Sequence, residues 1–171
     1  MSLTEDAIIK ELIPYIERTY RVKSGKEFRA IGGLSAGGYG TLRFILKYPE
    51  MFSGGIILSP AAYENIPPQT SSAMFVEPFM KNDEFSDELW KKYNYPALWD
   101  EFLVKHQPLK IYIASGDSDE LGILDVSYKV FKKFQDSGYS PAFRVVEGGH
   151  SWDVWESTVK DGIIMMFRDC F

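Results

Sequence analysis

The chain contains 171 residues and has a formal net charge of −5 at pH 7. This length is enough for one domain with a sizeable core, and we expect residues 1–171 to form a single domain. The negative charge, without a long basic run, argues against nucleic acid or an anionic membrane as the main partner. No apolar run approaches the ~18 residues that a membrane-spanning helix needs. Composition therefore agrees with a soluble enzyme.

Cysteine usage bears on the compartment. Cys170 is the single cysteine, so the chain cannot form an internal disulfide. A protein without disulfides fits a reducing compartment, and we expect a cytoplasmic location. The first residues also lack the basic region of a signal peptide, because Glu5 and Asp6 stand there instead.

Helical and strand-like patterns alternate along the chain. Thr4 is a plausible N-cap for an opening helix, whose apolar residues follow at helical spacing up to Ile16. Short apolar runs predict strands at 28–32, 56–58, 109–115 and 142–147. Helical spacing predicts helices at 41–47, 124–134 and 152–166. Strands that alternate with helices indicate an α/β fold, with a parallel sheet covered by helices on both faces.

The segment 61–107 interrupts this alternation. It is rich in proline and aromatic residues, and it contains one further predicted helix at 87–93. So long a connection is usually functional or has helices of its own. It is either a cap-like insertion whose aromatic side chains shape a substrate pocket, or a helical insertion whose aromatic side chains fill a small core. The two interpretations are compatible.

The pentapeptide Gly33-Leu34-Ser35-Ala36-Gly37 lies between the first predicted strand and the helix that follows it. Gly-x-Ser-x-Gly at such a junction is the pattern of a nucleophile elbow. The turn is so sharp that neighbouring side chains would collide, and glycines therefore flank the serine. The strand before and the helix after separate this match from chance. Ser35 is thus a candidate nucleophile.

A serine hydroxyl needs a base within hydrogen-bond reach and a third group that orients the base. His150 lies in a glycine loop that follows the last predicted strand. In a parallel sheet this loop lies at the carboxyl edge, where Ser35 is also expected. His106 precedes a strand, and we expect it near the amino edge, away from Ser35. His150 is therefore the candidate base, and His106 a surface or structural residue.

The acid is expected after the strand that precedes the histidine strand. Residues 117–120 form that loop and contain Asp117, Asp119 and Glu120. We favour Asp119, and the other two stay open. The chain order Ser35, Asp119, His150 is that of α/β-hydrolases.

Three blocks resemble a known family. Residues 32–40 and 48–54, then Gly116-x-x-Asp119, and then Gly149-His150-Ser151-Trp152-x-x-Trp155 are similar to the esterase D-like group of α/β-hydrolases. That group includes S-formylglutathione hydrolases and tributyrin, feruloyl, acetyl-xylan and siderophore esterases. The resemblance runs from about residue 10 to the C-terminus. Its motifs are specific for the group but not for any one member.

The resemblance implies the triad Ser35, Asp119 and His150, and an oxyanion donor at the backbone N–H of Ala36. Leu34 and Trp152 are further candidates for contact with substrate. Members of the group are typically longer, with strands and a second oxyanion donor before the opening helix. We therefore expect an α/β-hydrolase fold that is shortened at its N-terminus, with the elbow strand left at the sheet edge. An exposed edge of this kind invites a homodimer.

Together these features predict a serine hydrolase that cleaves carboxylic esters through an acyl-enzyme. The triad mechanism needs no metal or cofactor, and none is expected. The 117–120 loop could suggest a cation site, but its oxygens are too few and too local for a calcium loop. Two alternatives stay open. One is an incomplete hydrolase-fold module that acts in binding or assembly. The other is a thioesterase or peptidase of the same fold.

Overall fold

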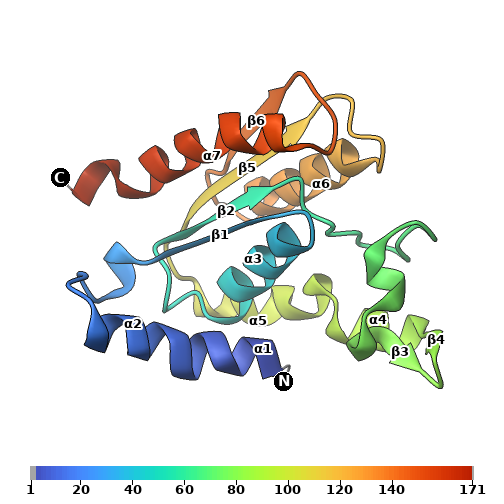
Figure 1. The fold of residues 1–171 in the computed structure, drawn as a ribbon, viewed down its shortest axis with the longest axis horizontal. Helices are drawn as coiled ribbons and strands as arrows, with labels where there is room; N and C mark the ends of the chain where they lie inside the picture. Colours follow the sequence, from blue (N-terminus) through green and yellow to red (C-terminus); the bar gives the residue numbers. More distant parts are fainter. Residues whose placement is uncertain (1–2, 171) are drawn as a thin grey trace.

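Four parallel strands form the central sheet in the computed structural model, which describes residues 3–170. Their order across the sheet is β1 (Ala30–Leu34), β2 (Gly54–Leu58), β5 (Lys110–Gly116) and β6 (Ala142–Val146). The carboxyl ends of β1, β2 and β5 are level, since Leu34 lies opposite Leu58 and Leu58 opposite Ala114. This arrangement confirms the predicted α/β fold class, and Figure 1 shows the helices on both sides of the sheet.

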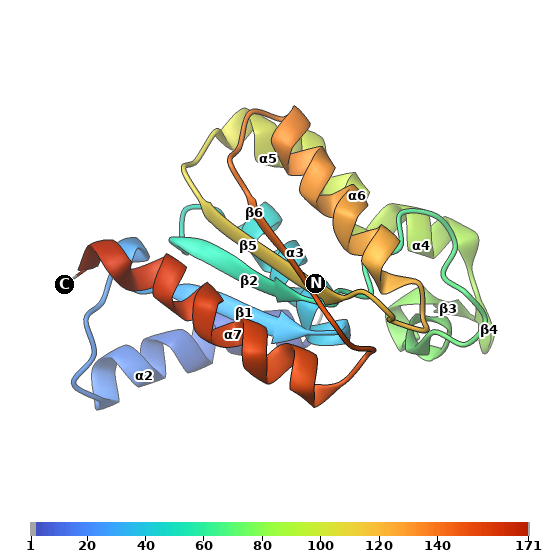
Figure 2. The same ribbon diagram turned by 90° about the horizontal axis from the view of Figure 1, so that it is seen from above.

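Helices cover both faces of the sheet. On one face lie α3 (Ala36–Lys47), α5 (Trp99–Lys105) and α6 (Ile123–Asp136), and on the other lies α7 (Trp152–Phe167) (Figure 2). Strand side chains alternate between two cores. Ile57 packs in the core under α3, whereas its neighbour Ile56 packs under α7. Both cores are buried, as expected for a parallel sheet.

The chain opens with an almost continuous helix made of α1 (Leu3–Asp6), a π-helical segment (Ala7–Leu12) and α2 (Ile13–Thr19). The predicted opening helix is thus present, but Thr4 is not its N-cap, because the helix already includes Leu3. Glu5 anchors this helix to α3 and the residue after it. Its carboxylate accepts hydrogen bonds from Lys47 and from the Tyr48 hydroxyl.

The predicted bounds of the first strand and of the helix that follows it were wrong. The first strand is β1 at 30–34 rather than 28–32, because Lys26–Phe28 form a 3₁₀ turn. The following helix begins at Ala36 rather than at Thr41. Glycine is unfavourable in both helices and strands. Because of the glycines in these stretches, the sequence pattern did not indicate the end of β1 or the start of α3, which packing on β2 stabilises.

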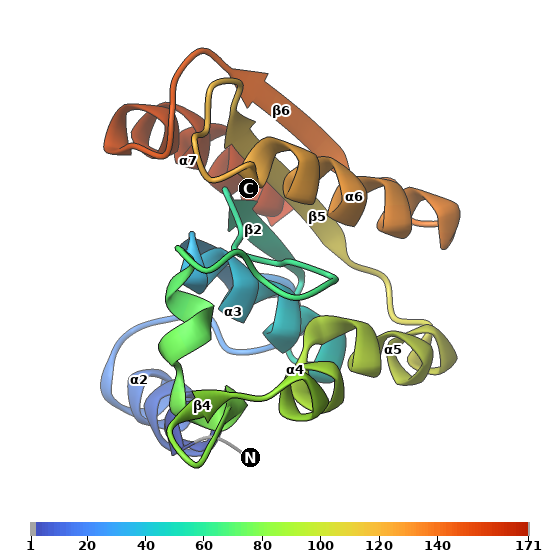
Figure 3. The ribbon, with the colours of Figure 1, turned by 90° about the vertical axis from the view of Figure 1, so that its right-hand side faces the viewer.

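The segment 61–107 forms a layer beside α3 (Figure 3). The predicted helix at 87–93 is confirmed as α4 (Asp87–Tyr93). Before α4 come 3₁₀ turns and a small hairpin, and a further turn precedes α5: Ser72–Phe75, Glu77–Phe79, β3 (Met80–Lys81), β4 (Glu84–Phe85) and Tyr95–Leu98.

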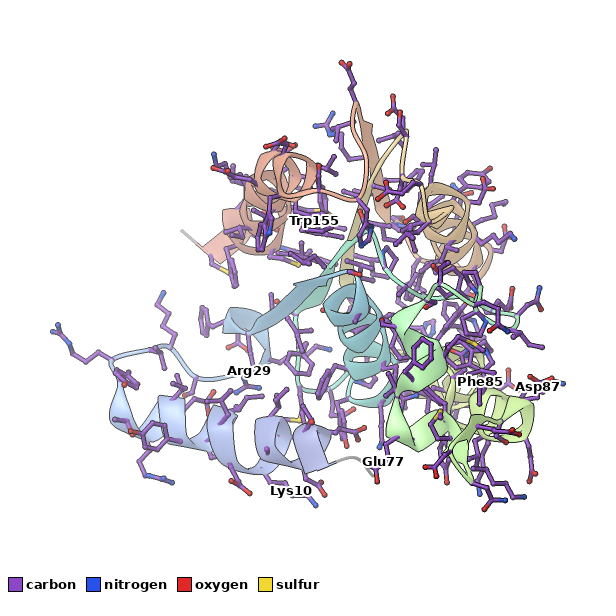
Figure 4. All side chains as sticks on the ribbon, turned by 45° about the vertical axis from the view of Figure 1, so that its right-hand side comes forward. Lys10, Arg29, Glu77, Phe85, Asp87 and Trp155 are labelled. Carbon is purple, nitrogen blue, oxygen red and sulfur yellow. The ribbon has the colours of Figure 1, made fainter. Side chains whose placement is uncertain are left out.

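Aromatic side chains of this segment build a small core around Trp90. The Trp90 ring meets Phe79 at a centroid distance of 4.7 Å and stacks on Tyr39 of α3 at 6.2 Å. Phe85, labelled in Figure 4, also packs against Trp90, with 5.9 Å between the ring centroids. Phe75 is different, because 74% of its surface is exposed. Most of the aromatic content thus stabilises the segment and attaches it to α3.

Candidate active site

Ser35 occupies the sharp turn between β1 and α3. Its backbone angles are φ 53° and ψ −118°, a conformation that non-glycine residues rarely adopt. The Ser35 N–H donates to the Leu58 carbonyl at 2.9 Å, and the Ser35 carbonyl accepts from the Ala61 N–H at 3.1 Å. Bonds to the last residue of β2 and to the chain that follows it therefore hold the strained residue in place.

Glycines allow this turn, but not the pair that the motif suggested. A Cβ on Gly33 would lie 2.4 Å from the Gly37 carbonyl oxygen, and one on Gly38 would lie 2.8 Å from the Leu58 carbonyl oxygen. A Cβ on Gly37 would meet no atom of the described chain within 4 Å. The steric requirement therefore falls on Gly33 and Gly38 rather than on both glycines of Gly-x-Ser-x-Gly.

His150 reaches the Ser35 hydroxyl from the loop between β6 and α7. The distance from Ser35 Oγ to His150 Nε2 is 2.9 Å. Since Nδ1 faces a carboxylate, which can only accept, Nδ1 holds the proton and Nε2 accepts from the hydroxyl. This is the arrangement in which the imidazole can take the serine proton.

Asp119 is the carboxylate that meets His150. Its Oδ2 accepts from His150 Nδ1 at 2.7 Å, and its Oδ1 accepts from the Leu121 N–H at 3.0 Å. The Asp119 side chain is fully buried, whereas the His150 side chain is 12% exposed. Of the three carboxylates in the loop, the structure therefore places Asp119 against the imidazole.

The other two carboxylates of this loop bind backbone N–H groups of the histidine loop. Asp117 Oδ1 accepts from Gly148 N–H at 3.0 Å, and Glu120 Oε2 accepts from His150 N–H at 3.2 Å. The bond from Gly148, with one from the Ser118 hydroxyl, holds the pKa of Asp117 below its usual value. The pKa of Glu120 is also lowered, by its own N–H and then by that of His150. Both residues therefore join the two loops as anions.

Ala36 begins α3 and is exposed beside Ser35. The first N–H groups of a helix lack partners within the helix and favour negative charge. The Ala36 N–H is therefore available to a developing oxyanion.

Residues 3–170 contain no cluster of three or more histidine, cysteine or acidic side chains positioned as ligands for a metal ion.

The remaining predicted residues lie as follows. Trp152 begins α7 and is 70% exposed, with its ring packed edge-on against Trp155 at 5.4 Å. Leu34 is half-buried and packs with the core under α7. His106 ends α5 in a left-handed conformation just before β5, at the opposite end of the strands from Ser35. His106 is therefore separate from the site, as expected.

Two residues beside the site were not predicted. Trp155 appeared only in the block that resembles the esterase D-like group, and Ser59 was given no role. In the structure, Trp155 contacts His150 and donates its indole N–H to Ser59. The Trp-x-x-Trp pattern after His150 was the signal that pointed to Trp155. No signal marked Ser59.

A family model described as putative esterase matches residues 1–166. The chain belongs to this esterase family. A curated relative, an acetyl esterase from Caldicellulosiruptor saccharolyticus, is 28% identical over 165 residues, which are 92% of this chain and 61% of the relative. The chain thus spans about three fifths of the relative's length.

Solved structures of esterases share the fold. A ferulic acid esterase matches with a TM-score of 0.72 and 24% identity, over 96% of this chain and 60% of that chain. An S-formylglutathione hydrolase from Staphylococcus aureus matches with a TM-score of 0.70 and 20% identity, over 95% and 61%. These likenesses support the hydrolase-type fold of the family.

Proposed function

We propose that this protein is a serine hydrolase that cleaves carboxylic esters. The observation that carries the proposal is the continuous hydrogen-bond chain from Ser35 through His150 to Asp119, with distances of 2.9 and 2.7 Å. A nucleophile, a base and an orienting acid in this order activate a hydroxyl at neutral pH. Membership of the esterase family supports the same reaction.

The proposed reaction has two halves. Ser35 Oγ attacks the ester carbonyl carbon as its proton passes to His150 Nε2, and the Ala36 N–H donates to the oxyanion. The tetrahedral intermediate then releases the alcohol, which takes the proton from His150. In the second half, water gives a proton to His150 Nε2 and attacks the acyl-enzyme carbonyl carbon. The bond from that carbon to Ser35 Oγ then breaks, Oγ takes the proton back from His150, and the carboxylic acid leaves. Asp119 accepts from Nδ1 throughout and stabilises the imidazolium.

The proposed substrates are small esters. The curated relative is named for acetyl ester cleavage, and one structural neighbour for ferulic acid ester cleavage. We propose that residues 1–171 form one domain and that 61–107 is a cap-like insertion that helps to select the ester. Phe75 supplies exposed apolar surface on this insertion, and Leu34 and Trp152 supply apolar side chains close in the chain to Ser35 and His150.

Turnover of short-chain nitrophenyl esters, combined with fluorophosphonate labelling, tests the proposal. The wild-type chain is expected to hydrolyse the esters and to be labelled at Ser35. Ser35→Ala is expected to lose both, whereas Ser140→Ala, at an exposed serine away from the triad, is expected to retain both. Absence of labelling and turnover in the folded wild type would refute the proposal and favour an incomplete hydrolase-fold module.

A panel of substrates separates the other enzymes of this fold. Acetyl, butyryl and feruloyl esters, a thioester and a short peptide are compared by kcat/KM. Higher kcat/KM for the oxygen esters is expected. Preference for the thioester or the peptide would replace the esterase with a thioesterase or peptidase, because the same triad serves all acyl transfers.

The open edge of β1 is a candidate for self-association. Among residues 3–170, β1 pairs with β2 alone, so its other edge offers unpaired backbone groups. We propose a homodimer through this edge. Light scattering after size exclusion is expected to give twice the mass of one chain. A monomer mass at every concentration would contradict the dimer.

We also propose a cytoplasmic location, because a chain whose single cysteine is Cys170 has no internal disulfide and fits a reducing compartment. Among the described helices, none combines the length and the apolar character needed to cross a membrane. Fractionation of the source cells tests the location, and recovery of the protein outside the cytoplasmic fraction would refute it.

A further inference from the structure

Ser59 and Trp155 form a buried hydrogen bond beside the triad. The Trp155 indole N–H donates to Ser59 Oγ at 3.0 Å. The two residues are 96 positions apart, one directly after β2 and the other in the second turn of α7. Ser59 is fully buried, and Trp155 lies between α7 and the sheet (Figure 4).

The backbone holds Ser59 firmly. Its φ of 38° lies in the left-handed region, which a serine adopts only where its surroundings require it. The Ser59 N–H donates to the Ala114 carbonyl at 2.7 Å. The residue before it, Leu58, accepts the Ser35 N–H. The acceptor for the indole therefore directly follows β2, the strand whose last residue also holds the nucleophile.

The Trp155 indole also packs against the His150 imidazole. The imidazole and the indole lie 5.0 Å apart between centroids, with an interplanar angle of 87°. This is the edge-to-face arrangement that aromatic pairs prefer. A ring packed at right angles to the imidazole resists rotation about the bond between its Cβ and Cγ atoms.

Such support matters most during the reaction. In the resting site, the bonds to Ser35 and Asp119 orient the imidazole. Once Ser35 Oγ has joined the acyl group, the Nε2 proton must go to the leaving alcohol, and the bond to Ser35 no longer holds the ring. A misplacement of about 1 Å at this stage can cost on the order of 10²-fold in rate.

We propose that Ser59 and Trp155 are positioning residues for His150. The hydrogen bond from the indole to Ser59 fixes the plane of Trp155, and Trp155 in turn holds the imidazole in line for proton transfer. The inference rests on the proposed function, since it assigns the pair a role in the same acyl transfer.

A double-mutant cycle tests the pair. Trp155→Phe keeps an aromatic ring but removes the N–H, and Ser59→Ala removes the acceptor while retaining a Cβ at the same backbone angles. Each variant is expected to lower kcat about 10-fold with little change in KM, because the ground-state ester does not need the imidazole to be aligned. Since both variants remove the same hydrogen bond, the kcat of the double variant is expected to resemble that of Trp155→Phe alone.

A second indole–hydroxyl pair supplies the matched control. Trp99 in α5 donates its indole N–H to Ser137 Oγ at 3.2 Å, in the core under α3 rather than beside His150. Trp99→Phe and Ser137→Ala are expected to lower the melting temperature by amounts similar to those of the test variants, while kcat stays at the wild-type level. Equal losses of kcat in both pairs would show a general structural effect and overturn the proposal.

An NMR measurement separates this inference from the proposed function. The His150 Nδ1 proton, in its 2.7 Å bond to Asp119, is expected to give a downfield resonance in the wild type. Trp155→Phe and Ser59→Ala are expected to broaden it by faster exchange, whereas Trp99→Phe is expected to leave it sharp. This measurement requires no turnover, so it tests the positioning of His150 even if the protein does not hydrolyse esters. An unchanged resonance together with unchanged kcat would refute the positioning role.

Discussion

Gly116 lies in direct backbone contact with Gly148. A Cβ on Gly116 would stand 2.1 Å from the Gly148 carbonyl oxygen, so no side chain fits there. The same carbonyl accepts the Ser118 N–H at 3.0 Å, and the Val146 carbonyl accepts the Asp117 N–H at 2.9 Å. This contact joins the loop of the candidate acid to the loop of the candidate base, and so it sets the separation of Asp119 and His150.

Gly116→Ala is therefore expected to separate the two loops. A backbone clash of this size cannot relax locally, and overpacking typically costs about 1–3 kcal/mol. We expect a lower melting temperature and a loss of kcat of about 10²-fold, since the imidazole is displaced. Ester kinetics and thermal unfolding measure both. Gly40→Ala is the control, because a Cβ there meets no atom of the described chain within 4 Å. Wild-type kcat in Gly116→Ala would contradict the explanation.

The two glycines of the Gly-x-Ser-x-Gly motif are expected to respond differently to substitution. Gly33→Ala places a Cβ 2.4 Å from the Gly37 carbonyl oxygen and is expected to destabilise the fold. Gly37→Ala meets no such obstacle among the described residues, and alanine restricts the unfolded chain. Chemical denaturation is expected to show Gly37→Ala as neutral or stabilised by about 0.4–1 kcal/mol. A larger loss in Gly37→Ala than in Gly33→Ala would reverse the assignment.

Substitution of each of the three carboxylates in the 117–120 loop shows which one acts as the acid of the triad. Asp119→Asn keeps the shape but favours the wrong imidazole tautomer, and we expect a loss in kcat of about 10⁴-fold. Asp117→Asn and Glu120→Gln affect bonds that do not involve the imidazole ring: those from the Gly148 and His150 backbone N–H groups and, for Asp117, the one from the Ser118 hydroxyl. Each variant is expected to lower kcat by less than about 10-fold. Kinetics of the three variants at one pH decide the point. If Asp117→Asn or Glu120→Gln lowered kcat as much as Asp119→Asn does, that residue would be assigned as the acid instead.

Acid is expected to loosen the N-terminal helix through Glu5. Burial alone would raise the pKa of this carboxyl, but hydrogen bonds from Lys47 and Tyr48 outweigh burial and lower the pKa. A carboxyl with a lowered folded-state pKa stabilises the protein above its unfolded-state pKa, and this stability is lost as the pH falls through the folded-state value.

Glu5→Gln is therefore expected to reduce the free energy of unfolding at neutral pH by about 1–3 kcal/mol. The difference from wild type is expected to shrink as the pH is lowered below the ordinary range of a glutamate. Denaturant unfolding at a series of pH values measures it. Glu11→Gln, at an exposed carboxylate of the same helical segment, supplies the control. A difference that persists unchanged in acid would exclude Glu5 as the cause.

Local pattern and chain order were enough for the architecture and for most of the candidate site. Helix and strand periods repeat within a few residues, so the alternation that makes a parallel sheet is visible in the sequence. Parallel strands bring their carboxyl ends to one edge, which is why Ser35, the 117–120 loop and His150 could be expected together. The boundaries of β1 and α3 were wrong because glycines there contradict local propensity, while packing on β2 overrides it.

Contacts between residues far apart in the chain determined the rest. Asp117, Asp119 and Glu120 have nearly the same local context, and the fold of the histidine loop against them selects Asp119 for the imidazole. The hydrogen bond between Ser59 and Trp155 joins a strand end to a helix 96 positions later. No local period encodes such distances and ring orientations, since they arise only when strands and helices pack in three dimensions.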